Sequence, residues 1–176
     1  MAAQYAFLDA IDVKLYPAGT DVKTAGVPAD DPVGTIVIDY LNESGLTIEA
    51  DAVYARAKGV SAVSFNGAKS GQFTMNSELL SMEHLALIMG GVYDEAANKI
   101  VVNNQDNSVS YVMVGTFRGK KRGDNTMQKF QIICYNVAPQ VNTDLQLSAL
   151  DIGAFELVLD ILVDEDGDMI EITQIV

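Results

Sequence analysis

Apolar and polar residues alternate with a period of two along most of this 176-residue chain, and that alternation restricts the possible folds more than any other feature. Successive side chains of a β-strand point to opposite faces, so this period predicts strands that bury one face and expose the other. Pro17, Pro28 and Pro32 interrupt the pattern and predict a long loop or an extended hairpin at 17–32. The segments with the pattern are 5–16, 33–41, 53–58, 60–65, 72–75, 99–102, 109–117, 127–137, 145–150, 155–163 and 169–175.

One segment has a helical period instead. Asn76 and Ser77 are residues that cap helix N-termini, and the glycine pair at 90–91 suits the left-handed conformation that ends a helix. The apolar residues between them fall on one side, which predicts one amphipathic helix at about 77–89. No repeat and no linker divides the sequence. We therefore expect a single domain over 1–176, a mainly-β sandwich or barrel of two packed antiparallel sheets with this helix on its flank.

The net charge restricts the partners of the chain. Acidic residues outnumber basic ones by 24 to 11, which gives a formal charge of -13. This excess argues against binding to a nucleic-acid backbone or to anionic lipid, because both draw on clustered Lys and Arg. Nine acids and no bases follow Lys129, whereas four bases lie together at 118–122. Since the C-terminal acids alternate with Leu, Ile, Val and Phe, we expect a folded segment with its carboxylates on one face.

The single cysteine and the single histidine limit the chemistry that the chain can carry. Cys134 has no second cysteine for an internal disulfide, and His84 has no second histidine for a metal site within one chain. Cys134 lies in a strand pattern, which predicts a buried structural residue. His84 lies in the predicted helix away from its apolar side, so we expect it at the surface or at an interface. No nucleophile elbow accompanies either residue.

Two glycine-containing segments resemble ligand loops but lack residues that those loops need. Segment 164–168, Asp-Glu-Asp-Gly-Asp, is oxygen-rich, but an EF-hand loop has its Gly at the sixth position, a Glu at the twelfth and flanking helices. We expect a solvated hairpin turn there, with weak adventitious Ca²⁺ binding as the alternative. In segment 67–71, Lys69 and Ser70 precede the second Gly, so we expect a turn rather than a phosphate loop.

Catalysis is not predicted. The many carboxylates leave a two-acid hydrolase open as an alternative, but an aromatic content of 7% without Trp is low for a sugar-binding cleft. No constellation of nucleophile, base and orienting group can be assembled from the motifs. We therefore expect a protein that is not an enzyme and that has no cofactor and no metal.

The uneven charge suggests a contact between copies of the chain. Segment 118–122 has no interleaved aromatic residues, which makes it a poor nucleic-acid surface. A basic segment and an acidic face can instead complement those of a second copy, head to tail. The candidate residues for such contacts between subunits are Arg118, Lys120, Lys121, Arg122, Asp30 and Asp31.

Three stretches carry a resemblance to a known family: the turn, strand and helix at 71–91, the strand at 127–137 and the closing hairpin at 154–172. Their order is similar to that of bacteriophage tail tube proteins. The resemblance implies hexameric rings of this chain, stacked into a hollow tube through which DNA leaves the capsid, with a long early loop that reaches the next ring. It also implies a place in the virion tail after synthesis in the cytoplasm of a bacterial host. Sheath, baseplate and tail-terminator proteins would be further partners.

The resemblance gives the acidic excess a use. Carboxylates that line a lumen repel the phosphate backbone, so DNA passes without binding. The candidate lining residues are Glu156, Asp160 and Glu171, because they oppose the apolar face of their strands. The alternative is that these acids are ordinary solvated surface that keeps the protein soluble.

Two other functional classes remain open. One is a tube protein of a contractile injection or secretion apparatus. The other is a non-enzymatic β-sandwich module for binding or capsid decoration. The first residues lack a basic n-region, and the apolar stretches are too short to span a bilayer, so we expect no signal peptide and no membrane anchor.

Overall fold

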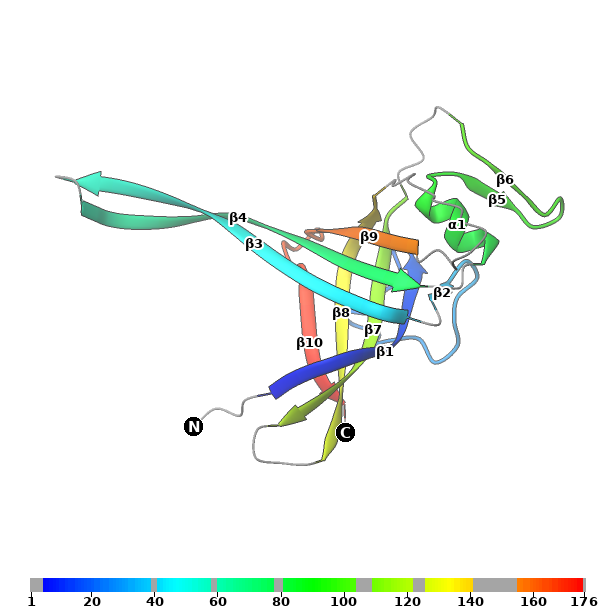
Figure 1. Ribbon diagram of the computed structural model, residues 1–176, viewed down its shortest axis with the longest axis horizontal. Helices are drawn as coiled ribbons and strands as arrows, with labels where there is room; N and C mark the ends of the chain where they lie inside the picture. Colours follow the sequence, from blue (N-terminus) through cyan, green and yellow to red (C-terminus); the bar gives the residue numbers. More distant parts are fainter. Residues whose placement is uncertain are drawn as a thin grey trace, which may run out of the picture.

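The computed structural model describes residues 5–38, 41–57, 60–77, 81–103, 109–121, 126–140 and 155–175. The predicted fold class is confirmed: the described residues are mainly β, and they form antiparallel sheets and one short helix (Figure 1). The predicted strand at 145–150 lies outside the described residues. In chain order the elements are β1 (Tyr5–Pro17), β2 (Ile36–Ile38), β3 (Leu41–Ala57), β4 (Val60–Ser77), α1 (Met82–Ile88), β5 (Val92–Asp94), β6 (Lys99–Val101), β7 (Tyr111–Lys121), β8 (Met127–Pro139), β9 (Phe155–Leu162) and β10 (Ile170–Ile175).

The larger sheet is hydrogen-bonded in the order β2-β1-β7-β8-β9-β4-β3, and β10 pairs with β8 beside this path. Two strands share one edge of β8, because its first part at 129–134 pairs with β10 and its end at 136–139 pairs with β9. The sheet divides there and curls until β3, at the far end of the path, contacts β1. The layers of the sandwich are therefore parts of one continuous sheet, and the second sheet is the small hairpin of β5 and β6.

The main core lies inside the curled sheet. Phe73 of β4 and Phe117 of β7 meet edge to face with their ring centroids 5.9 Å apart, although β8 and β9 separate the two strands in the sheet. The Phe117 ring lies so close to Gly115 that a Cβ on that residue would come 2.6 Å from Cε2 of the ring. Cys134 is fully buried in this core, as predicted, and burial raises the pKa of its thiol to about 12.

A second apolar cluster lies on the opposite, outer face of the same strands. It consists of Tyr16, Val112, Val114 and Ile133, together with Val22. Val22 belongs to the connection between β1 and β2, residues 18–35, which we call the strap. The strap includes the long loop predicted at 17–32, and it folds back over its own sheet through Val22, which is 5% exposed.

Helix α1 is shorter than the predicted helix at about 77–89, and its start was predicted wrongly. Asn76 and Ser77 are the last residues of β4, where they pair with β9, so the helix begins only at Met82. Cross-strand pairing thus overrides the capping preference of these two residues. The C-terminal end of the helix agrees with the prediction, because Gly90 has a φ of 62°, in the left-handed region that ends a helix. The helix packs against β5, β6 and β2.

Strands β3 and β4 are much longer than the strands predicted at 53–58, 60–65 and 72–75. They form one antiparallel ladder from the pair Leu41 and Ser77 to the pair Ala57 and Val60. Only 71–77 of β4 also pairs with β9. Figure 1 shows that the far part of the ladder extends away from the body. We call this part, residues 50–57 and 60–69, the arm.

Candidate functional site

Two of the three predicted lumen-lining acids lie on the outer face of β9. Leu157 and Leu159 of this strand point into the core, so Glu156 and Asp160 are on the opposite face, as the alternation predicted. Glu156 is exposed. The Asp160 carboxylate accepts hydrogen bonds from the side-chain amides of Gln72, at 3.0 Å, and Gln140, at 2.8 Å. These amide bonds fix the position of Asp160 beside a cleft of ≈ 330 Å³ at the root of the arm.

The third predicted acid, Glu171, lies on a different strand, β10, opposite Ile133 of β8. The Tyr135 hydroxyl donates a hydrogen bond to its carboxylate, and the Thr173 hydroxyl donates a second at 2.9 Å. These bonds hold the pKa of Glu171 below its usual value, and the bond to Glu171 raises the pKa of Tyr135 to about 12. The structure therefore brings Glu156 and Asp160 together on one strand, whereas Glu171 belongs to a separate network.

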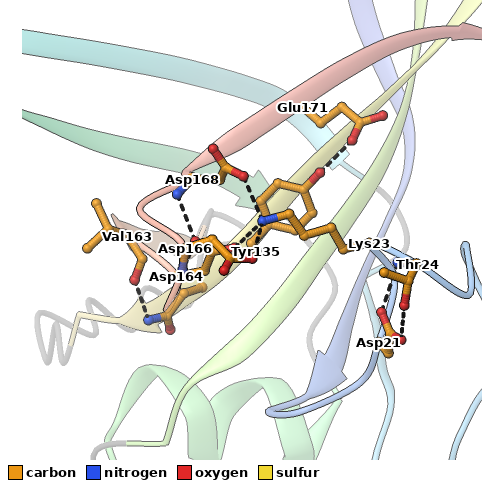
Figure 2. A network of polar contacts seen from close by, with 10 residues as sticks. Asp21, Lys23, Thr24, Tyr135, Val163, Asp164, Asp166, Asp168 and Glu171 are labelled. Carbon is orange, nitrogen blue, oxygen red and sulfur yellow. Dashed lines mark hydrogen bonds and ion pairs between the residues drawn. The ribbon is translucent and has the colours of Figure 1, made fainter.

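That network centres on Lys23 of the strap, a residue that no sequence pattern indicated. Its ammonium group lies 3.0 Å from Asp164, 2.8 Å from Asp166 and 2.6 Å from Asp168, as Figure 2 shows. It also lies 5.2 Å from the centre of the Tyr135 ring. The three carboxylates belong to the β9–β10 turn, and their hydrogen bonds raise the pKa of Lys23 far above its usual value. The strap is thus tied to the connection between β9 and β10.

The segment 164–168, which we call the acidic turn, is a turn as the sequence predicted, but it does not close the predicted hairpin, because β9 and β10 each pair with β8 and not with one another. The Asp164 carboxylate accepts the backbone N–H groups of Asp166, at 3.0 Å, and Asp168, at 2.7 Å, and Gly167 has a φ of 86°. Burial acts to raise the pKa of Asp164, but the bonds from Lys23 and from these N–H groups outweigh it and lower the pKa. Among the residues that the structure describes, no group of three His, Cys, Asp or Glu side chains could hold a metal ion.

The two predicted contact acids lie near the other end of the strap. Asp31 binds its own chain, because both of its carboxylate oxygens lie 2.8 Å from Nζ of Lys14. The Tyr16 hydroxyl donates a third hydrogen bond to Asp31 at 3.3 Å. Bonding to Asp31 raises the pKa of Lys14. Asp30 is exposed.

Three of the four predicted contact bases belong to a strand rather than to a loop. Arg118, Lys120 and Lys121 lie in β7, which runs further than the strand predicted at 109–117, and Arg122 lies outside the described residues. Arg118 is directly opposite Lys129 of β8. The far end of the β7–β8 hairpin is therefore strongly basic. β10 runs antiparallel to β8, so the acidic turn lies at the other end of their shared ladder.

The arm exposes backbone hydrogen-bonding groups. Among the described strands, β3 pairs only with β4, and residues 60–70 of β4 pair only with β3. The register sets Val53 opposite Phe65 and Ala55 opposite Val63, so apolar residues oppose one another across the arm. Within the arm, shifts in the register beside Ala50 and Ala55 interrupt the ladder at two points.

The two residues that were considered for nucleophilic chemistry lie in the core and in the helix. Cys134 is completely buried, and His84 lies within α1, where its side chain is outside the described part of the structure. No helix among the described residues is long and apolar enough to cross a membrane. No protein-family model matches the chain, and no curated protein matches it significantly. The function is therefore argued from the geometry.

Proposed function

We propose that this chain is the structural subunit of a hollow tube, formed by rings of its copies, of the kind that makes up a bacteriophage tail. The observation that carries the proposal is the arm. A two-stranded ribbon that leaves the body with both outer edges unpaired, within the described residues, is marginally stable by itself in water. It gains its stability when another chain pairs with an edge.

Pairing between copies would account for the length of the arm. A second copy has the same edges, so a ring of copies can satisfy them without any other protein. Closing the ring also removes the exposed strand edges that otherwise lead to uncontrolled aggregation. The curled body would then form the wall of the tube, with the arm as its connection to the neighbouring subunit.

The charges are compatible with a lumen for DNA. The outer face of β9 carries Glu156 and Asp160, and the amides of Gln72 and Gln140 add polar groups beside Asp160. A lumen lined by such a face repels phosphate and offers it no cation to bind. The basic end of the β7–β8 hairpin and the acidic turn offer complementary charges for stacking one ring on the next.

The proposal is tested by negative-stain electron microscopy of the purified chain over a series of concentrations. We expect hollow rods or six-fold rings from the natural sequence. In one variant the dipeptide Asn-Gly replaces residues 51–68. A two-residue turn then connects Ala50 to Lys69, which are partners in the natural register. This variant removes the arm alone, and we expect it to stay monomeric with an unchanged thermal transition.

A matched control shortens another hairpin. Asn-Gly in place of 95–98 joins Asp94 to Lys99 in β5–β6, and this variant should still assemble. If the armless variant forms tubes as readily as the control, the arm does not join the subunits. If the natural chain stays monomeric at every concentration, even with tail-initiation proteins added, the tube is refuted and the β-sandwich binding module is favoured.

A further inference from the structure

We propose that Lys23 is an ionic latch that holds the strap closed over the outer face of the sheet, and that the strap opens when this latch is released. The latch is a property of the single chain. Its test therefore uses the monomer, and its outcome is independent of whether the chain forms tubes.

The contacts of Lys23 are the first support. One ammonium group with 32% of its side chain exposed meets three carboxylates of the acidic turn, at 2.6 to 3.0 Å, and lies over the face of Tyr135. The acidic turn is more than a hundred residues further along the chain. A cation shared by several carboxylates forms a network, which stabilises an arrangement more than an isolated surface pair does.

The weak apolar packing of the strap is the second support. Among residues 18–35, Val22 is the only one that is buried, and Val27 is partly buried against the same cluster. Burial of one Val and part of a second is a small gain against the conformational entropy lost when a segment of this length is fixed. The ion pairs of Lys23 therefore supply a large share of what keeps this part of the strap closed.

The backbone allows the segment around the latch to move as a unit. Gly19 and Gly26 flank Val22 and Lys23, and both have a positive φ, of 83° and 80°. Glycine adopts other conformations from there at little cost, so these two positions can act as hinges. The strap stays attached at its far end, where Asp31 binds Lys14.

Opening would change what the outer face presents. A cleft of ≈ 360 Å³ lies between the strap, the start of β7 and Tyr135 of β8, and Val22 closes one side of it. When Val22 leaves, the apolar side chains of Val112 and Ile133 lose their cover. The latch thus controls whether this apolar surface is exposed to other molecules.

Hydrogen exchange measured by mass spectrometry tests the latch. A peptide covering 18–27 reports the N–H of Thr20, which is bonded across the Gly19 hinge to the Pro17 carbonyl at 3.2 Å and loses this bond when the strap opens. In K23M at low salt we expect exchange in this peptide to be faster by about tenfold. Peptides from β7 should exchange at the natural rate.

A high salt concentration should release the same latch without any substitution. At about 1 M NaCl the screening length falls to about 3 Å, which weakens partly exposed ion pairs. The natural chain should then exchange in 18–27 nearly as fast as K23M, and salt should change K23M little. The double variant D166N/D168N, which keeps Asp164 and its backbone bonds in the turn, should resemble K23M.

The control variant is K99M, which removes the longer ion pair between Lys99 and Asp94 at 3.9 Å in β5–β6. It should leave exchange in 18–27 unchanged. The latch is refuted if K23M exchanges at the natural rate in 18–27. It is also refuted if salt accelerates K23M as much as the natural chain, or if K23M loosens the β7 peptides to the same extent as the strap.

Discussion

Replacing Gly115 by Ala tests the packing of the core most directly. The new Cβ would lie 2.6 Å from Cε2 and 3.0 Å from Cζ of Phe117, which is closer than real Cβ contacts allow. The ring must therefore move, but it is 94% buried and packs edge to face on Phe73. We expect Gly115→Ala to destabilise the protein although Ala suits a strand better than Gly does.

The magnitude follows from three opposing effects. Overpacking a core costs about 1–3 kcal/mol, and disturbing the Phe73–Phe117 pair costs about 0.5–1.5 kcal/mol more. Replacing Gly by Ala restricts the unfolded chain and returns about 0.4–1 kcal/mol. The free energy of unfolding should therefore fall by about 2 kcal/mol, which lowers the melting temperature by about 4–8 °C for a chain of this size.

Urea denaturation followed by circular dichroism measures this loss, and Gly45→Ala in β3 is the matched control. A Cβ at Gly45 meets nothing within 4 Å, so this variant should be as stable as the natural chain or slightly more stable. The double variant G115A/F117L should lose less than the sum of its single variants, because the smaller side chain relieves the contact. A loss below about 0.5 kcal/mol for Gly115→Ala, or strict additivity, would refute the reasoning.

Three further predictions concern individual side chains. Cys134, whose thiol pKa is raised to about 12 by burial, should resist alkylation at pH 8 in the native protein and react at once in denaturant; reaction of the native protein would contradict its burial. Glu171→Gln should return the pKa of Tyr135 from about 12 towards its ordinary value, as followed by ultraviolet titration of the phenol. Because the folded-state pKa of Glu171 is depressed, its stabilising contribution is present above the unfolded pKa and is lost as the pH falls through the folded value; acid denaturation of this variant should therefore be less steep, and an identical acid transition would count against the bond. E156K/D160K should assemble normally but deliver less DNA from a reconstituted particle, and undiminished delivery would eliminate the acidic lining.

Much of the fold could be predicted because its strands bury one face and expose the other. The bounds of β1, β8, β9 and β10 fall within a few residues of the alternating segments, since core and solvent lie on opposite sides of each strand. The arm was recognised only in pieces. The register shift between Ala50 and Ala52 lies opposite Asn66 and Lys69, in the gap between the segments predicted at 60–65 and 72–75, where it breaks the period of two.

The sites were harder to predict because their partners are distant in the sequence. The strap and the acidic turn were each recognised from their own composition, as a long loop and a turn, although the turn joins two strands that both pair with β8 instead of closing a hairpin. No neighbouring residue in the sequence indicates that Lys23 of the strap meets Asp164 of the acidic turn. That contact depends on how the curled sheet brings the two connections together. The same applies to Asp31, whose partner Lys14 follows from the return of the strap to β1.

The order of strands in the sheet also governs when the chain can fold during synthesis. β3 and β4 are adjacent in sequence, so their ribbon can form as soon as both have left the ribosome. β1 must wait for β7, since Tyr5 pairs with Lys121 more than a hundred residues later, and β4 must wait for β9, since Gly71 pairs with Ile161 far along the chain. Pairing over such distances is slow. A nascent chain therefore carries its finished ribbon before it has a body, and it needs protection from neighbouring chains until β9 and β10 complete the sheet.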